Sequence, residues 1–399
     1  MTVAKLLSLD DAMATVLEHC RALPSERVAI GEAAGRVLAV SAQSVVDLPP
    51  FRASAMDGYA VRAADTPGRL PIAFRIGAGH PAPRPLAPGE AMAIATGGVV
   101  PELADAVVPI EDVTELDDSV EIDRAVEMSA NVRPVGRDAI KGAEVVGAGT
   151  RLGPGHIAAL AAAGIAEAMC ARRPQVAVLA TGTELRPPGT ELALGEVYES
   201  NGLMLAAQLR SVGADVHVLP AAADDEAAHR DAIARGLEFD VLVTSGGVSV
   251  GPHDLVRAIE RELGVIEIFW GVAVKPGKPV AFGRRDGTLV FGLPGNPVSS
   301  LVACELFVRP AVLALQGAAE PGPRFEVGRL AAHVTCDPRR DMLLRARSTI
   351  AADGVRLEPV AGQESHMIAR AAAADALVLV PRGDGSIAAG SPVRYVRTA

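Results

Sequence analysis

Three glycine-rich segments of this chain have the composition of phosphate-binding loops. They are the segments TGTE at 181–184, TSGGVSVG at 244–251 and GLPGNP at 292–297. Glycine lets the backbone approach a ligand closely, and the first turn of a helix offers unpaired N–H groups to a phosphate. One such segment is more often a tight turn, but three of them indicate an anion site. The GxxxxGK[ST] loop and the dinucleotide fingerprint GxGxxG after the first strand are both missing.

Charged residues accompany these loops. Lys275 and Lys278 stand in the proline-stiffened turn KPGKP, which suits a phosphate or another oxyanion, although a solvated surface turn would look the same. Glu184, Asp224 and Asp254 each follow an expected strand closely. Several carboxylates beside phosphate loops favour a Mg²⁺ site. Asp224 and Asp254 are also in positions where an acidic side chain caps a helix, so both readings stay open.

Other common site chemistries have no support in the sequence. The eight histidines show no HxxxH or HExxH spacing, which argues against a histidine zinc site. The four cysteines are far apart and form no CxxC pair, so we expect buried thiols in a reducing compartment. The segment GVSVG at 247–251 has the spacing GxSxG, but it lies within the second glycine-rich segment, and we do not expect a Ser–His–Asp hydrolase.

An alternation of strands and helices positions the three loops. Expected strands end at the first residues of the glycine-rich segments, and an expected helix follows each strand. This pattern predicts a parallel, doubly wound sheet, in which ligands bind beyond the carboxyl ends of the strands. The expected strands are 176–182, 215–223, 240–247 and 288–295, and the expected helices are 201–213, 225–237, 253–263 and 297–315.

The rest of the chain predicts further domains. Residues 9–23 have the apolar spacing of an amphipathic helix, and residues 154–170 resemble an alanine-rich helix. Short β-prone runs between Gly and Pro residues indicate an irregular β domain at about 58–150. Short strands return after residue 322, which predicts a small C-terminal β-barrel or sandwich.

Charge and hydropathy limit the partners. The 399 residues carry a formal net charge of −10, which argues against non-specific binding to nucleic acid or to an anionic membrane. An anionic ligand therefore requires a locally basic or amide-lined pocket. The first residues lack the apolar core of a signal peptide, and the apolar stretch at 156–171 is too short to span a bilayer. We expect a cytoplasmic protein.

Eight segments stand in order along nearly the whole chain: PPFRASAMDGYAVR (49–62), IATGGVVPELADAVVPIED (94–112), NVRPVGRDAIKG (131–142), ATGTEL (180–185), YESNG (198–202), TSGGVSVGPHD (244–254), VAVKPGKPVAFG (272–283) and GLPGNPVSS (292–300). Their combination of SAMDGYA, SGGVSVG, PGKP and GLPGNPVS is specific. The segments resemble those of the molybdopterin molybdenumtransferase family, the bacterial counterparts of the gephyrin E domain.

The resemblance implies an elongated homodimer of multidomain α/β chains. The implied domains are a discontinuous helical linker domain at 1–48 and 137–172, an irregular β domain at 49–136, an adenylyltransferase-like α/β domain at 173–320 and a C-terminal β-barrel at 321–399. It also implies an active site between the α/β domain of one subunit and the segment around Asp57 of the other.

The implied reaction uses adenylylated molybdopterin and molybdate, hydrolyses the adenylate with Mg²⁺ and leaves molybdenum on the dithiolene. By resemblance the catalytic residues are Asp57, Glu184, Asp224 and Asp254, of which Glu184, Asp224 and Asp254 are the metal ligands. The implied molybdate-binding residues are Lys275, Lys278, Arg345 and Ser365. The implied substrate-binding residues are Thr96, Asp138, Asn201, Ser245, Gly246, Gly247, Ser249, Gly251, Pro294, Asn296 and Pro297.

Two other functions fit part of the pattern. A molybdopterin adenylyltransferase would share the α/β domain, but it would not need the roughly 170 residues before that domain or the barrel after it. A gephyrin-like scaffold without catalysis would have no use for the acidic residues and lysines together. Partners implied by the resemblance are a molybdopterin adenylyltransferase and the apoproteins of molybdoenzymes.

Overall fold

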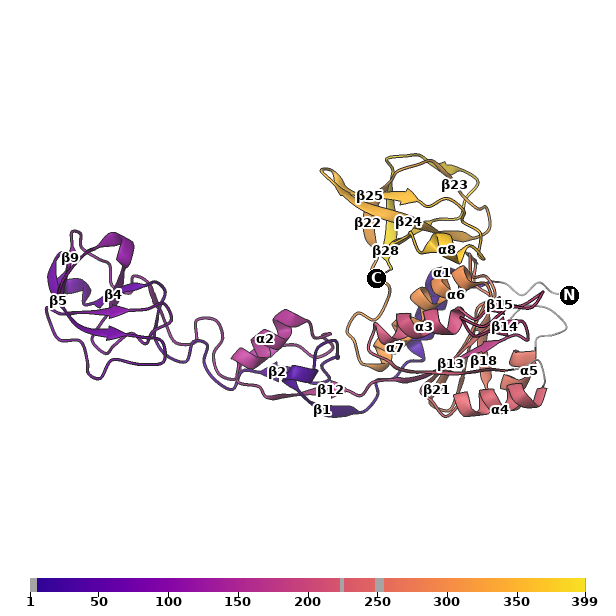
Figure 1. Ribbon diagram of the computed structural model, residues 1–399, viewed down its shortest axis with the longest axis horizontal. Helices are drawn as coiled ribbons and strands as arrows, with labels where there is room; N and C mark the ends of the chain where they lie inside the picture. The colour runs from indigo at the N-terminus through magenta and orange to yellow at the C-terminus, as the bar shows by residue number, and fades with distance from the viewer. Residues whose placement is uncertain (1–5, 223–225, 248–254, 399) are drawn as a thin grey trace.

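The computed structural model describes residues 6–222, 226–247 and 255–398. The chain is elongated (Figure 1): a β domain lies at one end, a linker region lies in the middle, and the α/β domain and a barrel lie at the other end. The multidomain α/β architecture expected from the sequence is confirmed.

A six-stranded sheet forms the centre of the α/β domain, in the order β16-β13-β17-β21-β20-β18. Strands β16, β13, β17 and β21 are parallel, whereas β20 is antiparallel to both of its neighbours. The four parallel strands are the predicted ones, and β18 and β20 were not predicted. The bounds are β13 (Gln175–Thr181), β16 (Asp215–Ala222), β17 (Val241–Ser245), β18 (Ile266–Trp270), β20 (Ala281–Arg285) and β21 (Thr288–Leu293).

Helices cover both faces of this sheet, so the doubly wound prediction is confirmed. Figure 1 shows α3, α6 and α7 on one face and α4 and α5 on the other. The predicted helix at 297–315 forms, with a π-helical turn in its middle. The bounds are α3 (Asn201–Arg210), α4 (Glu226–Gly236), α5 (Leu255–Glu262), α6 (Pro297–Ala303), η4 (Cys304–Val308) and α7 (Arg309–Leu315).

The segment Pro297–Leu315 is the one described helix long and apolar enough to cross a membrane, but 78% of it is buried inside the structure. Val298, Leu306 and Val312 are fully buried in the core that α6, η4 and α7 share with the sheet. Its hydropathy is therefore explained by its place in the α/β core.

The first helix, α1 (Leu9–Glu18), packs on the α/β domain. Ser8 caps it by accepting a hydrogen bond from the Asp11 N–H, and Leu9 and Val16 are buried in the core of that domain. Leu7 pairs with Val272 immediately before it. The expected assignment of residues 1–48 to one linker domain therefore differs from the packing, which places α1 with the α/β domain.

The linker region contains two small sheets and one helix. In these sheets β1 (Ser25–Ala29) pairs with β12 (Glu167–Ala171), and β2 (Ala42–Gln43) pairs with β11 (Glu144–Val146). Between them lie η1 (Ile30–Glu32) and α2 (Pro154–Ala162).

The predicted helix at 154–170 is wrong in its second half. Helix α2 ends at Ala162, and Gly164 follows with φ +80°. Residues 167–171 then pair with β1. Tertiary pairing has overridden the helical propensity of the alanines.

The β domain contains a six-stranded sheet in the order β7-β4-β6-β5-β9-β8. Short strands separated by Gly and Pro turns match the expected irregular β domain. The elements are β4 (Gly58–Val61), η2 (Ala63–Asp65), β5 (Gly68–Ile76), β6 (Ala91–Ile94), β7 (Ala106–Pro109), η3 (Ile110–Asp112), β8 (Thr114–Leu116) and β9 (Ser119–Ile122). Two chain segments join this domain to the linker region, and β3 (Ala53–Ser54) pairs with β10 (Val132–Arg133) at their outer end.

The C-terminal residues form a closed barrel, because β26 pairs with β24 as well as with β28. Its strands are β22 (Glu326–Leu330), β24 (Asp341–Ala351), β25 (Gly354–Pro359), β26 (Ala376–Val380) and β28 (Pro392–Arg397). Strand β19 (Val274–Lys275) of the α/β domain extends this sheet by pairing with β24. The remaining elements are β14 (Leu185–Arg186), β15 (Val197–Tyr198), β23 (Val334–Thr335), α8 (Ile368–Ala371) and β27 (Ser386–Ile387).

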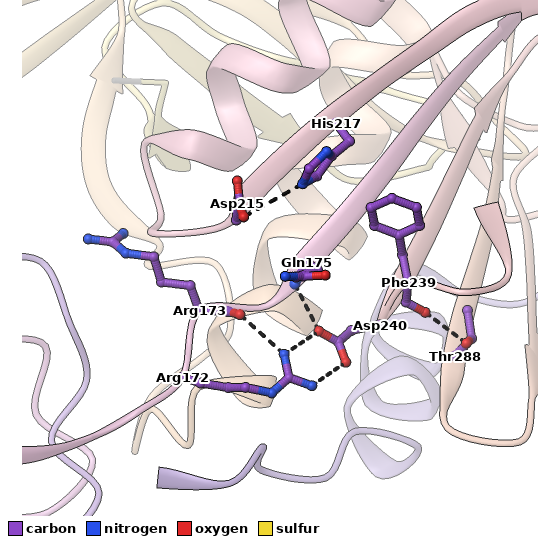
Figure 2. Close-up of polar contacts among 8 residues, drawn as sticks. All are labelled: Arg172, Arg173, Gln175, Asp215, His217, Phe239, Asp240 and Thr288. Carbon is purple, nitrogen blue, oxygen red and sulfur yellow. Dashed lines mark hydrogen bonds and ion pairs between the residues drawn. The ribbon is translucent and has the colours of Figure 1, made fainter. Parts of the chain in front are cut away.

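A network of polar contacts closes the amino end of the α/β sheet (Figure 2). The Arg172 guanidinium donates two hydrogen bonds of 2.7 Å to the two carboxylate oxygens of Asp240. The backbone N–H of Gln175 donates to the same carboxylate at 2.8 Å, and the Thr288 hydroxyl donates to the Phe239 carbonyl at 2.8 Å. Because Arg172 follows β12 directly, this network also anchors the linker region to the sheet.

Candidate functional site

The three glycine-rich loops leave the sheet side by side. Ala180 pairs with Ser245, and Ser245 pairs with Leu293, so β13, β17 and β21 end at the same level. The Gly246 N–H donates to the Leu293 carbonyl at 3.0 Å, and the Thr181 hydroxyl donates to the Ser245 carbonyl at 3.4 Å. The structure therefore gathers the loops as the sequence pattern predicted.

The close contact between these loops requires glycine at positions 246 and 247. Gly246 has φ +99°, and a Cβ atom there would lie 2.8 Å from the Thr181 carbonyl oxygen. Gly247 has φ +65°, and its Cβ would lie 2.5 Å from Val256 Cγ2. Any side chain would therefore be strained by its backbone angle and would also collide with a neighbour.

Asn201 connects the second and third loops. Its side-chain amide donates to the Ser245 hydroxyl at 2.9 Å and to the Gly295 carbonyl at 2.8 Å. The Ser245 hydroxyl in turn donates to the Pro294 carbonyl at 3.4 Å. Asn201, Ser245 and Pro294, all predicted to bind substrate, thus meet, and these contacts hold the loops in place.

The third loop leads into α6. Pro297 occupies its first turn and Asn296 is the N-cap residue, with φ −64° and ψ 124°. Within the described residues the Asn296 side chain makes no capping hydrogen bond, and its exposure makes the amide accessible to a ligand.

The expected metal ligands fall only partly within the described residues. Glu184 is exposed, and its carboxylate turns back toward Gly182, where a Cβ atom would lie 2.5 Å from Glu184 Oε2. Asp224, Asp254, Ser249 and Gly251 lie outside the described residues. Across 6–222, 226–247 and 255–398, no group of three or more His, Cys, Asp or Glu residues is arranged to hold a metal ion.

Glu199 is a residue of this region that the sequence reasoning did not single out. Its carboxylate accepts a hydrogen bond of 2.7 Å from the Gly202 N–H in the first turn of α3. An acidic residue just before a helix is a favourable partner for the free N–H groups there. The position of Glu199 just before Asn201, the first residue of α3, is the sequence feature that could have identified it.

The KPGKP turn lies at the same edge of the sheet. Strand β20 begins at Ala281, which pairs with Gly292 near the end of β21, so the preceding turn lies beside the third loop. Gly277 packs near Ser299 of α6. The structure thus brings Lys275 and Lys278 next to the glycine-rich loops, as the anion-site prediction requires.

Lys275 also contacts the barrel. Its Nζ atom lies 3.8 Å from Asp337 Oδ2. Hydrogen bonds from the backbone N–H groups of Arg339 and Arg340, at 2.9 and 3.1 Å, and the nearby Arg340 guanidinium hold the pKa of Asp337 below its ordinary value. The lysine is therefore positioned beside a carboxylate that stays ionised.

Arg345 is almost fully buried in the barrel, with 1% of its surface exposed. Its guanidinium donates to the carbonyls of Gly362, Glu364 and Met367 at 2.8, 3.4 and 3.4 Å, and burial lowers its pKa. These bonds hold the loop that carries Ser365, whose carbonyl accepts a 3.1 Å hydrogen bond from the Val298 N–H in α6. In this structure Arg345 thus positions the loop next to the α/β domain.

The remaining predicted residues lie on the β-domain side. Asp57 Oδ1 accepts a 2.7 Å hydrogen bond from the Thr96 N–H, so these two residues meet. Gly58 follows Asp57 where β4 passes β7, and a Cβ atom on it would lie 2.0 Å from the Val108 carbonyl oxygen. Asp138 is exposed on the connection to the linker region.

These β-domain residues do not reach the α/β loops within one chain. Figure 1 shows β4, which follows Asp57, at the opposite end of the molecule from α3, with the linker region between them. One chain therefore carries two separate groups of predicted site residues.

A second group near Asp57 was missed by the sequence reasoning. Tyr59 donates to Glu115, and the Arg75 guanidinium donates to the same carboxylate at 2.5 Å. Tyr59, Ala93 and Arg75 are in register on adjacent strands. Burial and the Glu115 hydrogen bond raise the pKa of Tyr59 to about 12, and the hydrogen bond from Tyr59 lowers the pKa of Glu115.

Taken together, the α/β domain has backbone amides, two lysines and an exposed carboxylate at the carboxyl ends of its strands. This combination can bind a phosphate or another oxyanion and can neutralise its charge. Fold and site thus define a multidomain α/β protein with a candidate site for a phosphate-type ligand at the edge of its central sheet.

Comparison with known families assigns the chain. Residues 7–164 match the MoeA N-terminal region (domain I and II), residues 177–314 match the "Probable molybdopterin binding domain", and residues 327–397 match the MoeA C-terminal region (domain IV). The molybdopterin molybdenumtransferase of Haemophilus influenzae is 38% identical over 320 residues, 78% of each chain. That of Staphylococcus aureus (strain MRSA252) is 30% identical over 98% of this chain and 96% of the relative.

Comparison with solved structures supports the same family. A molybdopterin biosynthesis MoeA protein from Pyrococcus horikoshii aligns with TM-score 0.85 and 27% identity, over 99% of this chain and 100% of the other. A second MoeA structure, from Pyrococcus horikosii, gives TM-score 0.80 at 33% identity over 98% and 99% of the two chains. The chain belongs to the molybdopterin molybdenumtransferase family and is an enzyme, which confirms the resemblance seen in its motifs.

Proposed function

We propose that this enzyme inserts molybdenum from molybdate into adenylylated molybdopterin, with Mg²⁺-dependent hydrolysis of the adenylate to give molybdenum cofactor and AMP. The observation that carries the proposal is the meeting of three glycine-rich loops and the KPGKP turn at one edge of the sheet. Membership in a family of molybdenumtransferases supports the same reaction.

The chemistry of each group of residues in the α/β domain suits a different part of the substrates. The Gly246 N–H already donates to the Leu293 carbonyl, so we assign the phosphates of the nucleotide and pterin to the Gly247 amide and the exposed Asn296 side chain. Lys275 and Lys278 are suited to binding the molybdate oxyanion, because a lysine presents a compact positive charge. Their charges also offset the charge that develops when the phosphoanhydride is cleaved.

Glu184 is the described residue that fits a Mg²⁺ site, because its exposed carboxylate stands beside the first loop and carboxylate oxygens are ligands that Mg²⁺ prefers. We propose Asp224 and Asp254 as its companions. A bound Mg²⁺ would supply charge neutralisation at the phosphoanhydride.

We further propose that the enzyme acts as a homodimer. The β domain, which carries Asp57 and Thr96, lies at the opposite end of the molecule from the α/β domain of its own chain (Figure 1), so we infer that a second copy supplies the other half of each site. A two-fold arrangement would place the β domain of each chain against the α/β domain of the other. The chemistry also requires an adenylyltransferase to supply the substrate and apoenzymes to accept the product.

The first test follows AMP release from adenylylated molybdopterin with Mg²⁺, with and without molybdate. We expect release that depends on molybdate and that Glu184→Gln or Asp254→Ala abolishes. Asp215→Ala is the matched control, because it removes a carboxylate from the amino end of the same sheet. A nucleotide that binds but is never cleaved would leave a scaffold role instead.

The second test addresses the shared site. Asp57→Ala and Glu184→Gln chains are each expected to be inactive as homodimers. When they are co-expressed, a mixed dimer contains one site with both residues intact, so AMP release should return. Activity that stays absent in mixed dimers isolated by two affinity tags would contradict a site built from two chains.

A further inference from the structure

One loop of the barrel, residues 360–367, contacts the start of α6 in the α/β domain. The Val298 N–H is the first that α6 offers, because Pro297 has none, and it donates to the Ser365 carbonyl at 3.1 Å. The N-cap residue Asn296 makes no side-chain capping bond. The barrel loop therefore caps α6 in place of the helix's own N-cap side chain.

Gln363 fixes this loop at the edge of the barrel. Strand β25 last pairs with β24 where Pro359 faces Ala346. Beyond that point the Gln363 side chain pairs with the backbone of Arg345: its Oε1 atom accepts from the Arg345 N–H at 3.1 Å, and its Nε2 atom donates to the Arg345 carbonyl at 2.9 Å. Nε2 also donates to the Val360 carbonyl at 2.8 Å. The carboxamide thus continues the β pairing where the main chain leaves the strand.

The Arg345 guanidinium holds the same loop from inside the barrel. It donates to the carbonyls of Gly362 and Glu364, and its Nε atom donates to Gln363 Oε1 at 3.4 Å. The Gln363 oxygen therefore accepts from both the backbone and the side chain of Arg345. Removing this shared acceptor is costly, because Arg345 is buried and its donors are shielded from water.

Helix α6 passes its position on to two of the glycine-rich loops. Ser300, two residues after Val298, is fully buried, and its hydroxyl donates to the Pro294 carbonyl of the third loop. The same hydroxyl lies 3.3 Å from the Ser245 hydroxyl of the second loop. A shift of α6 relative to the barrel would therefore move both loops.

We propose that Gln363 is a positioning residue for the reaction at the carboxyl edge of the sheet. It holds the loop 360–367 against α6 and so sets the alignment of the second and third glycine-rich loops. It acts through Ser365 and Ser300 and not by contact with the substrate. Its role in the reaction rests on the proposed function, whereas the connection from Gln363 to α6 is a property of the ligand-free protein.

Gln363→Met tests this connection, because methionine keeps the length of the side chain and forms neither of the amide hydrogen bonds. In the ligand-free, full-length protein we expect amide hydrogen exchange in the peptide 294–301 to speed up by about tenfold or more, since the acceptor of the Val298 N–H is no longer fixed. A peptide covering 175–181, in the centre of the sheet, should not change. Gln43→Met, the same substitution at an exposed position of β2, is the matched control. Unchanged exchange at 294–301 in Gln363→Met would overturn the proposal.

Activity measurements show whether this alignment matters for the reaction. We expect the kcat for AMP release by Gln363→Met to fall by about tenfold or more, since small displacements of positioning groups have effects of that size. The KM for adenylylated molybdopterin should change less, because the groups that bind it remain in place. A lower Tm with an unchanged kcat per folded protein would show a purely structural role and would refute the positioning role.

A second variant tests whether the effect passes through α6. Ser300→Ala breaks the bond between α6 and the Pro294 carbonyl without changing the barrel. If Gln363 acts through α6, the kcat of the double variant should be close to that of the less active single variant, because residues of one network are not additive. Losses that multiply would contradict the proposal. If Gln363→Met does not fold, Gln363→Glu, which keeps the acceptor for the Arg345 N–H, takes its place in the same measurements.

The two kinds of measurement separate this inference from the proposed reaction. Wild-type protein without any molybdate-dependent AMP release would refute the reaction, and exchange at 294–301 would still test the connection from Gln363 to α6. Wild-type release that is fully retained in Gln363→Met would refute only the positioning role.

Discussion

The two edges of the α/β sheet are built from the same strands and have opposite character. At the amino edge, Asp240 receives both hydrogen bonds of the Arg172 fork and one from the Gln175 backbone, so its polar groups satisfy one another (Figure 2). At the carboxyl edge, Gly246 and Gly247 have positive φ angles that glycine adopts without strain, and the Asn296 side chain makes no capping hydrogen bond.

The difference shows where stability and ligand binding are located in this domain. Paired charges at the amino edge secure the linker region to the sheet. The exposed lysines Lys275 and Lys278 at the carboxyl edge are available to an anionic ligand, because the parallel strands leave their loops there. Substitutions at the two edges should therefore separate activity from stability.

The carboxyl edge should lose activity when its backbone geometry is disturbed. Gly246→Val places a side chain where a Cβ atom would already be 2.8 Å from the Thr181 carbonyl oxygen. We expect AMP release to fall by about a hundredfold or more, since displacing a positioning loop by an ångström has effects of that size. Gly287→Ala at the amino edge is the control, because a Cβ atom there meets nothing within 4 Å. Equal losses in both variants would refute the distinction.

The amino edge should lose stability without losing activity. Asp240→Ala leaves the Arg172 guanidinium and the Gln175 N–H without their partner. We expect the free energy of unfolding in urea to fall by about 2 kcal/mol, as for other charged hydrogen bonds that lose one partner. Asp215→Ala, which removes only a 3.6 Å contact with His217, should change it little. An unchanged midpoint for Asp240→Ala would mean that the network does not anchor the sheet.

Lys275 should affect the oxyanion more than the nucleotide. Lys275→Ala is expected to raise the KM for molybdate by about tenfold, the size of one lost charged contact. The KM for adenylylated molybdopterin should change less. Lys141→Ala, in the linker region, is the control. A variant that alters both constants equally would place Lys275 outside the molybdate site.

Acid should weaken the contact between Lys275 and the barrel. The pKa of Asp337 is lowered in the folded protein from its ordinary 3.8, so its stabilising effect is complete above that value and is lost as the pH falls through the lower folded pKa. We expect the Tm difference between the wild type and Asp337→Asn to shrink as the pH falls below 3.8. A difference that is constant between pH 6 and pH 3 would contradict this assignment.

Much of the α/β domain could be predicted from local patterns. Apolar runs followed by glycine-rich segments identified β13, β17 and β21 and the helices after them, because strand and helix periodicities are encoded in neighbouring residues. The same patterns placed Lys275, Lys278 and the three loops at one edge, since parallel strands align their carboxyl ends.

Structural features that depend on contacts between distant parts of the chain could not be predicted from local patterns. Residues 167–171 look helical but form β12, because β1 supplies a pairing partner more than a hundred residues earlier in the chain. The sequence of α1 predicts an amphipathic helix, but only the structure shows that its apolar face packs on the α/β core. The buried guanidinium of Arg345 likewise binds its own loop, a role set by the closure of the barrel.

For the candidate site, too, local sequence predicted one part and the tertiary structure determined the rest. Residue types and short spacings were enough to identify a phosphate loop, a lysine turn and a set of carboxylates, since their chemistry is local. The tertiary structure decided that Asp57 and Thr96 meet each other far from those loops, and that the Ser365 carbonyl of the barrel caps the start of α6. These relations join segments tens of residues apart, and only the paths of the chain between domains determine them.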